Sequence, residues 1–301
     1  MKNWKHFAGC GLALAALATF TSFTALAEPK IPDDYKTGGF AIGCQAYSFN
    51  RFTAFEAIEK TAQAGGKVIE FFPGQKLSQE DPNLTVDHNS PQVDVVVAKL
   101  KAKLAEYHIL PVNYGVVGIP EDEAGARKVF EFAKKLGLRA VTTESTESIN
   151  TIEKLVKEYD ICVGYHDHPG NIKNPNYKVW NPYYIAGLVT GRDHRIGACA
   201  DTGHWTRSGI NPVDALRVLK GRIISLHLKD LNEFGKLDAH DVPYGTGVGE
   251  IKACLDELKA QGFDGNISIE YEYNWEHSVP EIKQCVDFVR NHKPSESAAS
   301  K

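Results

Sequence analysis

The sequence lacks a surplus of basic residues. It carries 34 lysines and arginines against 38 aspartates and glutamates, which gives a formal net charge of −4 at pH 7. A protein that binds nucleic acid needs a basic surface to neutralise phosphates. We therefore expect no nucleic-acid partner.

Long hydrophobic runs are also lacking beyond the N-terminal region. Residues 1–27 combine the positive charges of Lys2 and Lys5 with an apolar run and the small-x-small sequence Ala25-Leu26-Ala27. These features are typical of a signal peptide that is cleaved before Glu28. Because no later segment approaches 18 uncharged apolar residues, we expect no membrane span. The sequence thus predicts an exported protein, periplasmic or secreted.

Cysteines are few and widely spaced. Five remain after residue 27, which is an odd number, and three of these lie in predicted strands. We expect them to be buried small hydrophobic side chains rather than a disulfide framework. Cys254 and Cys285 are the one pair for which a disulfide stays open, because export would permit it.

Predicted strands and helices alternate strictly along residues 28–293. The strands are predicted at residues 40–47, 67–72, 109–116, 138–144, 161–166, 195–201, 222–230 and 265–273. A segment with the apolar spacing of a helix follows each of them. Eight such units favour an α/β fold, a single-domain (β/α)8 TIM barrel. An open doubly wound sheet is disfavoured, because no glycine-rich phosphate turn follows the first strand. The tail at 294–301 is expected to be disordered.

The C-terminal ends of these predicted strands are unusually polar. Side chains alternate between the two faces of a strand, so His227 and Lys229 share one face of the seventh strand. Glu270 and Glu272 share one face of the eighth. Charged groups that face a barrel interior are costly unless they are paired, hydrogen-bonded or bound to a metal. Since active sites of such barrels lie at these strand ends, we expect the site there.

Four of the polar residues form a candidate metal site. Glu144, Asp201, His227 and Glu270 come from four different strand ends. One nitrogen and three carboxylates suit one divalent ion such as Mn²⁺, Mg²⁺, Co²⁺ or Zn²⁺, with open positions for substrate oxygens. Each residue alone has a structural interpretation; Asp201 could simply cap the turn before His204. Four such residues at one rim favour the metal site.

Several stretches resemble the xylose isomerase-like TIM-barrel superfamily, in particular its sugar isomerase/epimerase branch. They are Asp-Thr-Gly-His-Trp (201–205), His-Leu-Lys-Asp (227–230), Ile-Glu-Tyr-Glu (269–272), Tyr-His-Asp-His (165–168) and Tyr-Gly-Thr-Gly-Val-Gly (244–249). The resemblance implies one divalent metal bound by Glu144, Asp201, His227 and Glu270, with His204 at substrate oxygens. The chain departs from the family in one respect, since epimerases of free ketoses often have a glutamate where it has His166.

The expected activity is isomerisation or epimerisation of a carbohydrate, through removal of a proton next to a carbonyl group and an enediolate. Glu144 and Glu270 would transfer the proton on opposite faces of the substrate carbon. The remaining substrate contacts are expected from Glu70, His166, His204, Trp205 and Lys229, with Glu70 and Trp205 shaping the pocket. Structural roles are equally open for two of them, Glu70 in an ion pair and Lys229 in a pair with Asp230.

Other functions stay open at this point. Deprotonation beside the carbonyl of a 3-keto-glycoside can expel the anomeric substituent, so a secreted lyase or hydratase would use the same chemistry. A non-catalytic sugar-binding barrel is a third possibility. An abasic-site endonuclease of the same superfamily is disfavoured by the net acidity and the small number of metal-binding histidines. The sugar, the native metal and the oligomeric state, a homo-oligomer included, are not determined by the sequence.

Overall fold

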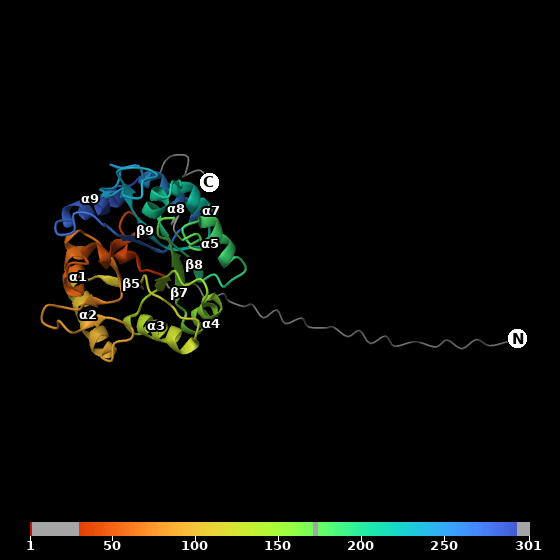
Figure 1. Ribbon diagram of the computed structural model, residues 1–301, viewed down its shortest axis with the longest axis horizontal. Coiled ribbons are helices and arrows are strands. Elements are labelled where there is room, and N and C mark those ends of the chain that lie inside the picture. Colours follow the sequence, from red (N-terminus) through yellow and green to blue (C-terminus); the bar gives the residue numbers. More distant parts are fainter. Residues whose placement is uncertain (2–29, 171–173, 294–301) are drawn as a thin grey trace.

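Eight parallel strands close into a barrel at the centre of the computed structural model (Figure 1). The barrel strands are β1 Ala41–Gln45, β2 Val68–Phe71, β5 Leu110–Tyr114, β6 Ala140–Thr143, β7 Cys162–His166, β8 Ile196–Asp201, β9 Ile223–Leu228 and β12 Asn266–Ile269. They pair in chain order, and β12 pairs with β1 to close the ring. The predicted (β/α)8 barrel is confirmed.

The structure describes residue 1, residues 30–170 and residues 174–293. The predicted signal peptide, apart from residue 1, and the predicted disordered tail at 294–301 lie outside the described residues. Within the described ranges no helix is both long enough and apolar enough to cross a membrane.

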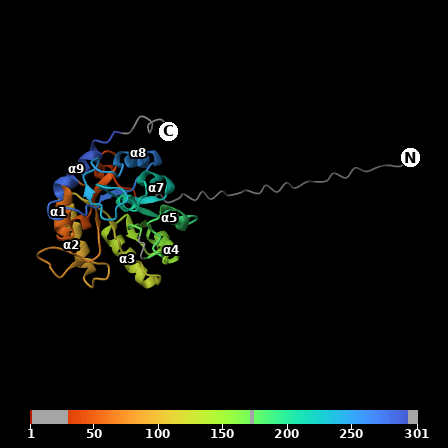
Figure 2. The same cartoon turned by 45° about the horizontal axis from the view of Figure 1, so that its top comes forward.

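Helices surround the barrel as a complete outer layer. They are α1 Ala54–Gln63, α2 Val93–Tyr107, α3 Glu123–Leu136, α4 Ile149–Tyr159, α5 Pro182–Val189, α6 Thr202–Arg207, α7 Pro212–Val218, α8 Ile251–Gln261 and α9 Val279–Arg290. The colours run round this layer in chain order, so the last helix, α9, lies beside α1 (Figures 1 and 2). Leu226 and Leu228 of β9 are fully buried, as expected for the strand face that packs under helices.

Local sequence explains where several helices begin. Thr53 and Glu56 form a capping box at the start of α1, with Thr53 N–H donating to Glu56 Oε2 at 2.8 Å. Asn211 caps α7, and Pro212 occupies its first position, where no amide hydrogen is needed. These caps hold the helices that flank the polar end of the barrel.

Short elements interrupt three segments that were expected to be loops. β3 Gln75–Lys76 pairs with β4 Thr85–Val86 after the second barrel strand. β10 Asp230–Leu231 pairs with β11 Asp241–Val242 after β9. Helix α6 begins directly at the end of β8, because Asp201 Oδ1 accepts the backbone N–H of His204 at 2.8 Å. The segment after Asp201 is therefore the first turn of a helix rather than a free turn.

The cysteines behave as small hydrophobic side chains. The five cysteines after residue 27 are all fully buried, which confirms the expectation from the sequence. Cys254 and Cys285, the pair for which a disulfide was left open, are both free thiols in the structure.

Candidate active site

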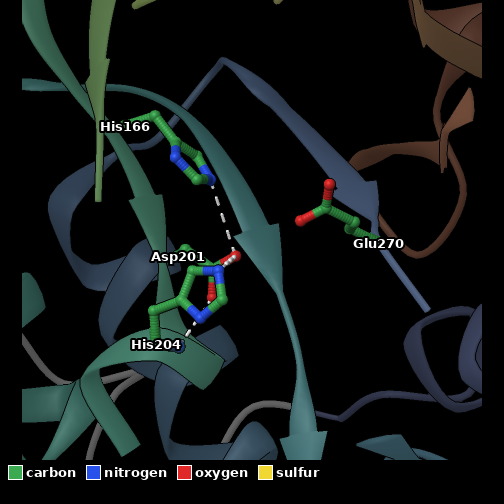
Figure 3. A group of neighbouring side chains, drawn as sticks. All are labelled: His166, Asp201, His204 and Glu270. Carbon is green, nitrogen blue, oxygen red and sulfur yellow. Dashed lines mark hydrogen bonds and ion pairs between the residues drawn. The ribbon is translucent and has the colours of Figure 1, made fainter. Parts of the chain in front are cut away.

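The polar strand ends meet at one mouth of the barrel. His166 ends β7, Asp201 ends β8, and Glu270 directly follows β12. Figure 3 shows these side chains pointing toward a common region, together with His204 from the first turn of α6. His227 joins them from β9, where it lies opposite Asp201 in the strand register.

The two ring nitrogens of His227 have different surroundings. Its Nε2 lies 3.1 Å from Glu70 Oε2, whereas its buried Nδ1 has no hydrogen-bond partner. A carboxylate can only accept, so the nitrogen that faces Glu70 carries a proton. The other nitrogen, Nδ1, lies 3.2 Å from Glu270 Oε2 and 3.8 Å from Asp201 Oδ2. Burial alone would lower the pKa of His227, but the nearby groups of Cys199, Glu70 and Glu270 hold it well above its ordinary value. The carboxylates thus favour a positive charge at Nδ1, either a proton or a cation beside it.

Glu70 is anchored deep in the barrel, where it is 0% exposed. Thr142 donates to its Oε1 at 2.9 Å, and Ser268 donates to its Oε2 at 2.9 Å. Because the side chain of Glu70 is enclosed by these partners and His227, it has no surface left for a sugar. The prediction that Glu70 shapes the substrate pocket is corrected: it is a buried partner of His227.

His166 repeats the arrangement of His227 with another carboxylate. Its Nδ1 lies 3.3 Å from Glu144 Oε1, and its buried Nε2 has no hydrogen-bond partner and lies 3.7 Å from Asp201 Oδ2. Burial alone would lower the pKa of His166, but the neighbouring carboxylates of Asp201 and Glu144 raise it to about 10. The carboxylates thus favour a positive charge at this position, either a proton on the imidazole or a cation beside it.

His204 differs from the other two histidines. Its Nδ1 lies 3.0 Å from Arg207 Nη1, and a guanidinium can only donate. Burial holds the pKa of His204 well below its ordinary value, so the ring is neutral. We infer that its proton is on Nε2, which lies 3.6 Å from Asp201 Oδ2. His204 therefore offers an N–H donor here rather than a lone pair.

Lys229 lies beneath the mouth with its side chain fully buried. Its Nζ is 3.1 Å from Asp201 Oδ2, 2.8 Å from Glu270 Oε2 and 2.7 Å from Glu272 Oε2. Burial would lower the pKa of Lys229, but these carboxylates hold it well above its ordinary value. The alternative in which Lys229 pairs with Asp230 is wrong, because the Asp230 carboxylate accepts backbone N–H groups of the following glycine-rich loop instead.

The predicted metal ligands are brought together only in part. Asp201, His227 and Glu270 face one another, whereas Glu144 Oε1 contacts His166, His168 and Tyr177. Hydrogen bonds from both histidines lower the pKa of Glu144 to about 2, against the opposite effect of burial. Glu144 is therefore linked to Asp201, His227 and Glu270 through His166 rather than by direct contact.

The residues present fit a divalent cation. His166 Nε2, Asp201 Oδ2 and His227 Nδ1 are buried polar atoms without hydrogen-bond partners, and they converge from three neighbouring strands. Ligand atoms of His166, Asp201, Glu270 and also His204 lie within 4.8 Å of one another, and His227 Nδ1 lies 3.2 Å from Glu270 Oε2. His166, Asp201, His227 and Glu270 offer two imidazole nitrogens and two carboxylates, a donor set that is common for Mn²⁺, Co²⁺ and Zn²⁺. Each imidazole is held from behind by a carboxylate, as metal-binding histidines usually are.

A pocket of about 330 Å³ opens beside this group. Its lining includes Gln45, Tyr47, Phe72, Gly115, His166, His168, Glu270 and Glu272. Trp205 was expected to wall the pocket but is only 2% exposed and belongs to the hydrophobic core. That expectation is corrected, because the indole of Trp205, the fourth residue of α6, packs in the hydrophobic core.

Sequence reasoning missed several residues that line this mouth. His168 has a half-exposed side chain, and its Nδ1 lies 2.5 Å from Glu144 Oε1. It is two residues from His166, so the alternation of side chains in a strand could have placed both on one face. Tyr47 and Phe72 carried no comparable signal, because apolar residues next to strands usually belong to the core.

Comparisons with known proteins agree with this architecture. A family model described as xylose isomerase-like TIM barrel matches residues 58–292. The crystal structure of an uncharacterized protein from Parabacteroides distasonis is 32% identical, covers 83% of this chain and 98% of its own, and superposes with a TM-score of 0.66.

Two further matches carry functional names. A protein named inosose dehydratase from Clostridium tetani is 30% identical over 142 residues, which cover 42% of this chain and 45% of that protein, so the match spans less than half of its length. The crystal structure of a 3-keto-D-glucoside 4-epimerase from E. coli is 13% identical, covers 83% of this chain and 99% of that one, and has a TM-score of 0.62. At that identity the second comparison shows the fold alone.

Proposed function

Because the chain belongs to the xylose isomerase-like TIM-barrel family, we propose that it is a divalent-metal-dependent sugar isomerase or epimerase that moves a proton next to a carbonyl group. The observation that carries this proposal is the convergence of three unpartnered buried atoms, on His166, Asp201 and His227, beside a pocket lined by Glu270. A buried imidazole nitrogen without a hydrogen-bond partner is costly in a purely structural site.

In this proposal the metal is held by His166, Asp201, His227 and Glu270. When bound, the ion supplies a Lewis acid that makes the carbon next to a carbonyl group more acidic. Glu144 and Glu70 then orient the two imidazoles from behind, which replaces the direct ligand role first proposed for Glu144. Two nitrogen donors suit Mn²⁺, Co²⁺ or Zn²⁺ better than Mg²⁺.

Proton transfer needs one group on each side of the substrate carbon. Glu270 lines the pocket, and its carboxylate would remove the proton. His168 also lines the pocket and is hydrogen-bonded to Glu144, so this pair would return the proton from the other side. His204, as a neutral N–H donor, would stabilise negative charge that develops on a substrate oxygen. Lys229, whose ammonium is bound by three carboxylates, would hold Asp201 and Glu270 in place.

A second candidate reaction is elimination, and the relative named inosose dehydratase favours it. Here Glu270 would take the proton next to the carbonyl group, the electron pair of that C–H bond would form a carbon–carbon double bond, and the neighbouring oxygen substituent would leave. His168 would give the leaving oxygen its proton. The same groups thus serve a dehydratase or a lyase on 3-keto-glycosides.

Isotope exchange in D2O separates these reactions. With Mn²⁺ present, an isomerase or epimerase would incorporate deuterium into a ketose or a 3-keto-glucoside without release of its substituent, as followed by proton NMR. A lyase would release the substituent from the 3-keto-glucoside. Binding of sugar with neither exchange nor release, and unchanged in Glu270→Gln, would contradict the proposal and support a binding protein.

Metal content tests the site directly. We expect elemental analysis to find about one divalent ion per chain in the wild-type protein and none in His227→Ala or His166→Ala. His194, an exposed histidine whose side chain is half-accessible, provides the control variant His194→Ala, which should keep the metal. Full metal occupancy in His227→Ala would contradict the assignment of the metal to this site.

We also propose that the protein is exported, from the Lys2, Lys5 and Ala25-Leu26-Ala27 pattern alone. N-terminal sequencing of the protein recovered from the periplasm or medium should begin at Glu28. An uncleaved N-terminus on the exported protein would contradict this assignment.

A further inference from the structure

Two aromatic rings, Tyr47 and Phe72, line the pocket, and a third, Trp275, packs against Tyr47. Tyr47 lies on the short helix η2 Ala46–Phe49, Phe72 follows β2, and Trp275 lies in the segment after β12. The ring of Tyr47 meets Phe72 edge-on at a centroid distance of 5.2 Å and Trp275 edge-on at 6.0 Å. We call these three residues the aromatic shelf. Tyr47 is 39% exposed, which is unusual for a large ring that has two aromatic neighbours.

Buried hydrogen bonds hold the shelf in place. Gln45 Oε1 accepts the backbone N–H of Tyr47 at 2.9 Å, and Gln45 Nε2 donates to the carbonyl of Gly115 at 2.8 Å. An ion pair of 3.0 Å between Arg51 and Glu276 joins the segment after η2 to the segment after β12. The position of Tyr47 is therefore preorganised, which lowers the cost of binding a partner against its ring.

The charges around the pocket disfavour a phosphorylated sugar. Among the described residues that line it there is no lysine or arginine, whereas Glu270 and Glu272 both contribute carboxylates. Lys229 lies close by, but its ammonium is already bound by Asp201, Glu270 and Glu272. A phosphate group would meet like charge there without the bidentate basic partners that phosphate sites use.

We propose that the substrate is an unphosphorylated sugar joined to a second ring, and that this second ring stacks on the aromatic shelf. The inference rests on the proposed function, in which the first ring lies over the histidine–carboxylate group. A pocket of about 330 Å³ is at the small end of ligand sites, so a second ring has to lie at its mouth. Tyr47 lines the pocket and is partly exposed, so its ring can contact that second ring. The substrate class is thus a neutral glycoside with a sugar or aryl aglycone.

Calorimetric binding to the Mn²⁺-loaded protein tests the inference without turnover. The probes are methyl and phenyl β-D-glucosides, methyl and phenyl β-D-galactosides, D-glucose and D-glucose 6-phosphate. We expect phenyl glycosides to bind about tenfold more tightly than methyl glycosides, the effect of one aromatic contact. D-glucose 6-phosphate should bind no more tightly than D-glucose.

Variants of the shelf should remove only the preference for the second ring. In Tyr47→Ala and Trp275→Ala we expect phenyl and methyl glycosides to bind equally. Because Trp275 does not line the pocket, Trp275→Ala should leave the affinity for methyl glycosides unchanged. Tyr47→Phe keeps the ring and should keep the preference. Tyr183 on α5 is 71% exposed and does not line the pocket, so Tyr183→Ala is the matched control.

Three results would overturn the inference: tighter binding of D-glucose 6-phosphate than of D-glucose, a phenyl preference that survives both alanine variants, or no binding of any neutral glycoside. These failures are distinguishable from failure of the proposed function. Deuterium exchange with free ketoses as fast as with glycosides would leave the reaction intact and remove the role of the shelf. Shelf-dependent binding without exchange or release would support the role of the shelf and contradict the proposed function.

Discussion

At the scale of single residues, two histidines have the same arrangement of neighbours. His166 and His227 each place one nitrogen on a carboxylate and leave the other free toward Asp201. In the proposed function, this symmetry distinguishes residues that would hold a cation from residues that would orient its ligands. Glu144 and Glu70 belong to the second group, because their oxygens are taken by the imidazoles and by neighbouring donors.

The role of Glu144 can be tested by replacing its carboxylate with an amide. In Glu144→Gln the amide oxygen still accepts from His166, so we expect the metal to bind with roughly 10- to 100-fold lower affinity but still to reach full occupancy. Asp201→Asn should lose the metal. Titration with Mn²⁺ measures both, and Glu147→Gln, an exposed neighbour, is the control. If Glu144→Gln loses the metal as completely as Asp201→Asn, Glu144 is itself a ligand.

Asp241 predicts a pH dependence of stability. Burial raises the pKa of Asp241 to about 7, although Lys229 and Arg207 oppose this. An aspartate in the unfolded chain titrates near pH ~4. Between these values the folded state binds the additional proton, so its stability falls as the pH rises from about 4 to about 7.

Asp241→Asn should remove this loss. In metal-free protein we expect no gain in the free energy of unfolding near pH 4 and a gain on the order of 4 kcal/mol at pH 8. Urea denaturation at the two pH values measures it, and the exposed Asp238→Asn serves as control. An equal effect of Asp241→Asn at both pH values would show that its carboxyl group does not titrate in this range.

At the scale of elements, the glycine-rich loop after β9 depends on one carboxylate. Asp230 accepts the N–H groups of Gly245, Gly247 and Gly249 at 2.8, 3.0 and 2.7 Å. A Cβ atom at Gly247 would lie 2.2 Å from the carbonyl oxygen of Leu231, so the close approach requires glycine. The motif at 244–249 is thus structural, although it resembles a family signature.

Asp230→Ala would leave three amide groups without their acceptor. We expect it to lower the free energy of unfolding by about 3 kcal/mol or more, since hydrogen bonds to a charged group are each worth about 1.5–3 kcal/mol. Thermal or urea unfolding measures the loss. Asp238→Ala, in the same segment but exposed, should change stability by less than about 0.5 kcal/mol.

The sequence was a good guide to elements and a weaker one to contacts between them. Period-two alternation placed His227 and Glu270 toward the barrel interior, and the structure agrees. It could not show that Glu144 turns toward His168, because that contact depends on the packing of two separate loops. The sequence offered Asp201 as a possible cap for the turn before His204, and Asp201 does cap there, but the turn continues as helix α6.

At the scale of the whole molecule, a cation at this site would join four strands. His166, Asp201, His227 and Glu270 belong to or directly follow β7, β8, β9 and β12. A ligand at a hundredfold excess over its Kd stabilises by about 2.7 kcal/mol. We therefore expect Mn²⁺ to raise the Tm by roughly 5–10 °C relative to protein treated with EDTA, as measured by calorimetry. His227→Ala should show no such rise, and an equal rise in that variant would place the ion elsewhere.

The barrel is closed by its two most distant strands. Residues 41–44 of β1 pair with residues 266–269 of β12, and α9 packs beside α1. Contacts so far apart in sequence form late and slowly, because a long loop must be ordered before they can contribute. During synthesis the ring cannot close until nearly the whole chain has left the ribosome. Until then β1 and the partial sheet keep an open edge, and this nascent chain is the form that chaperones would have to protect.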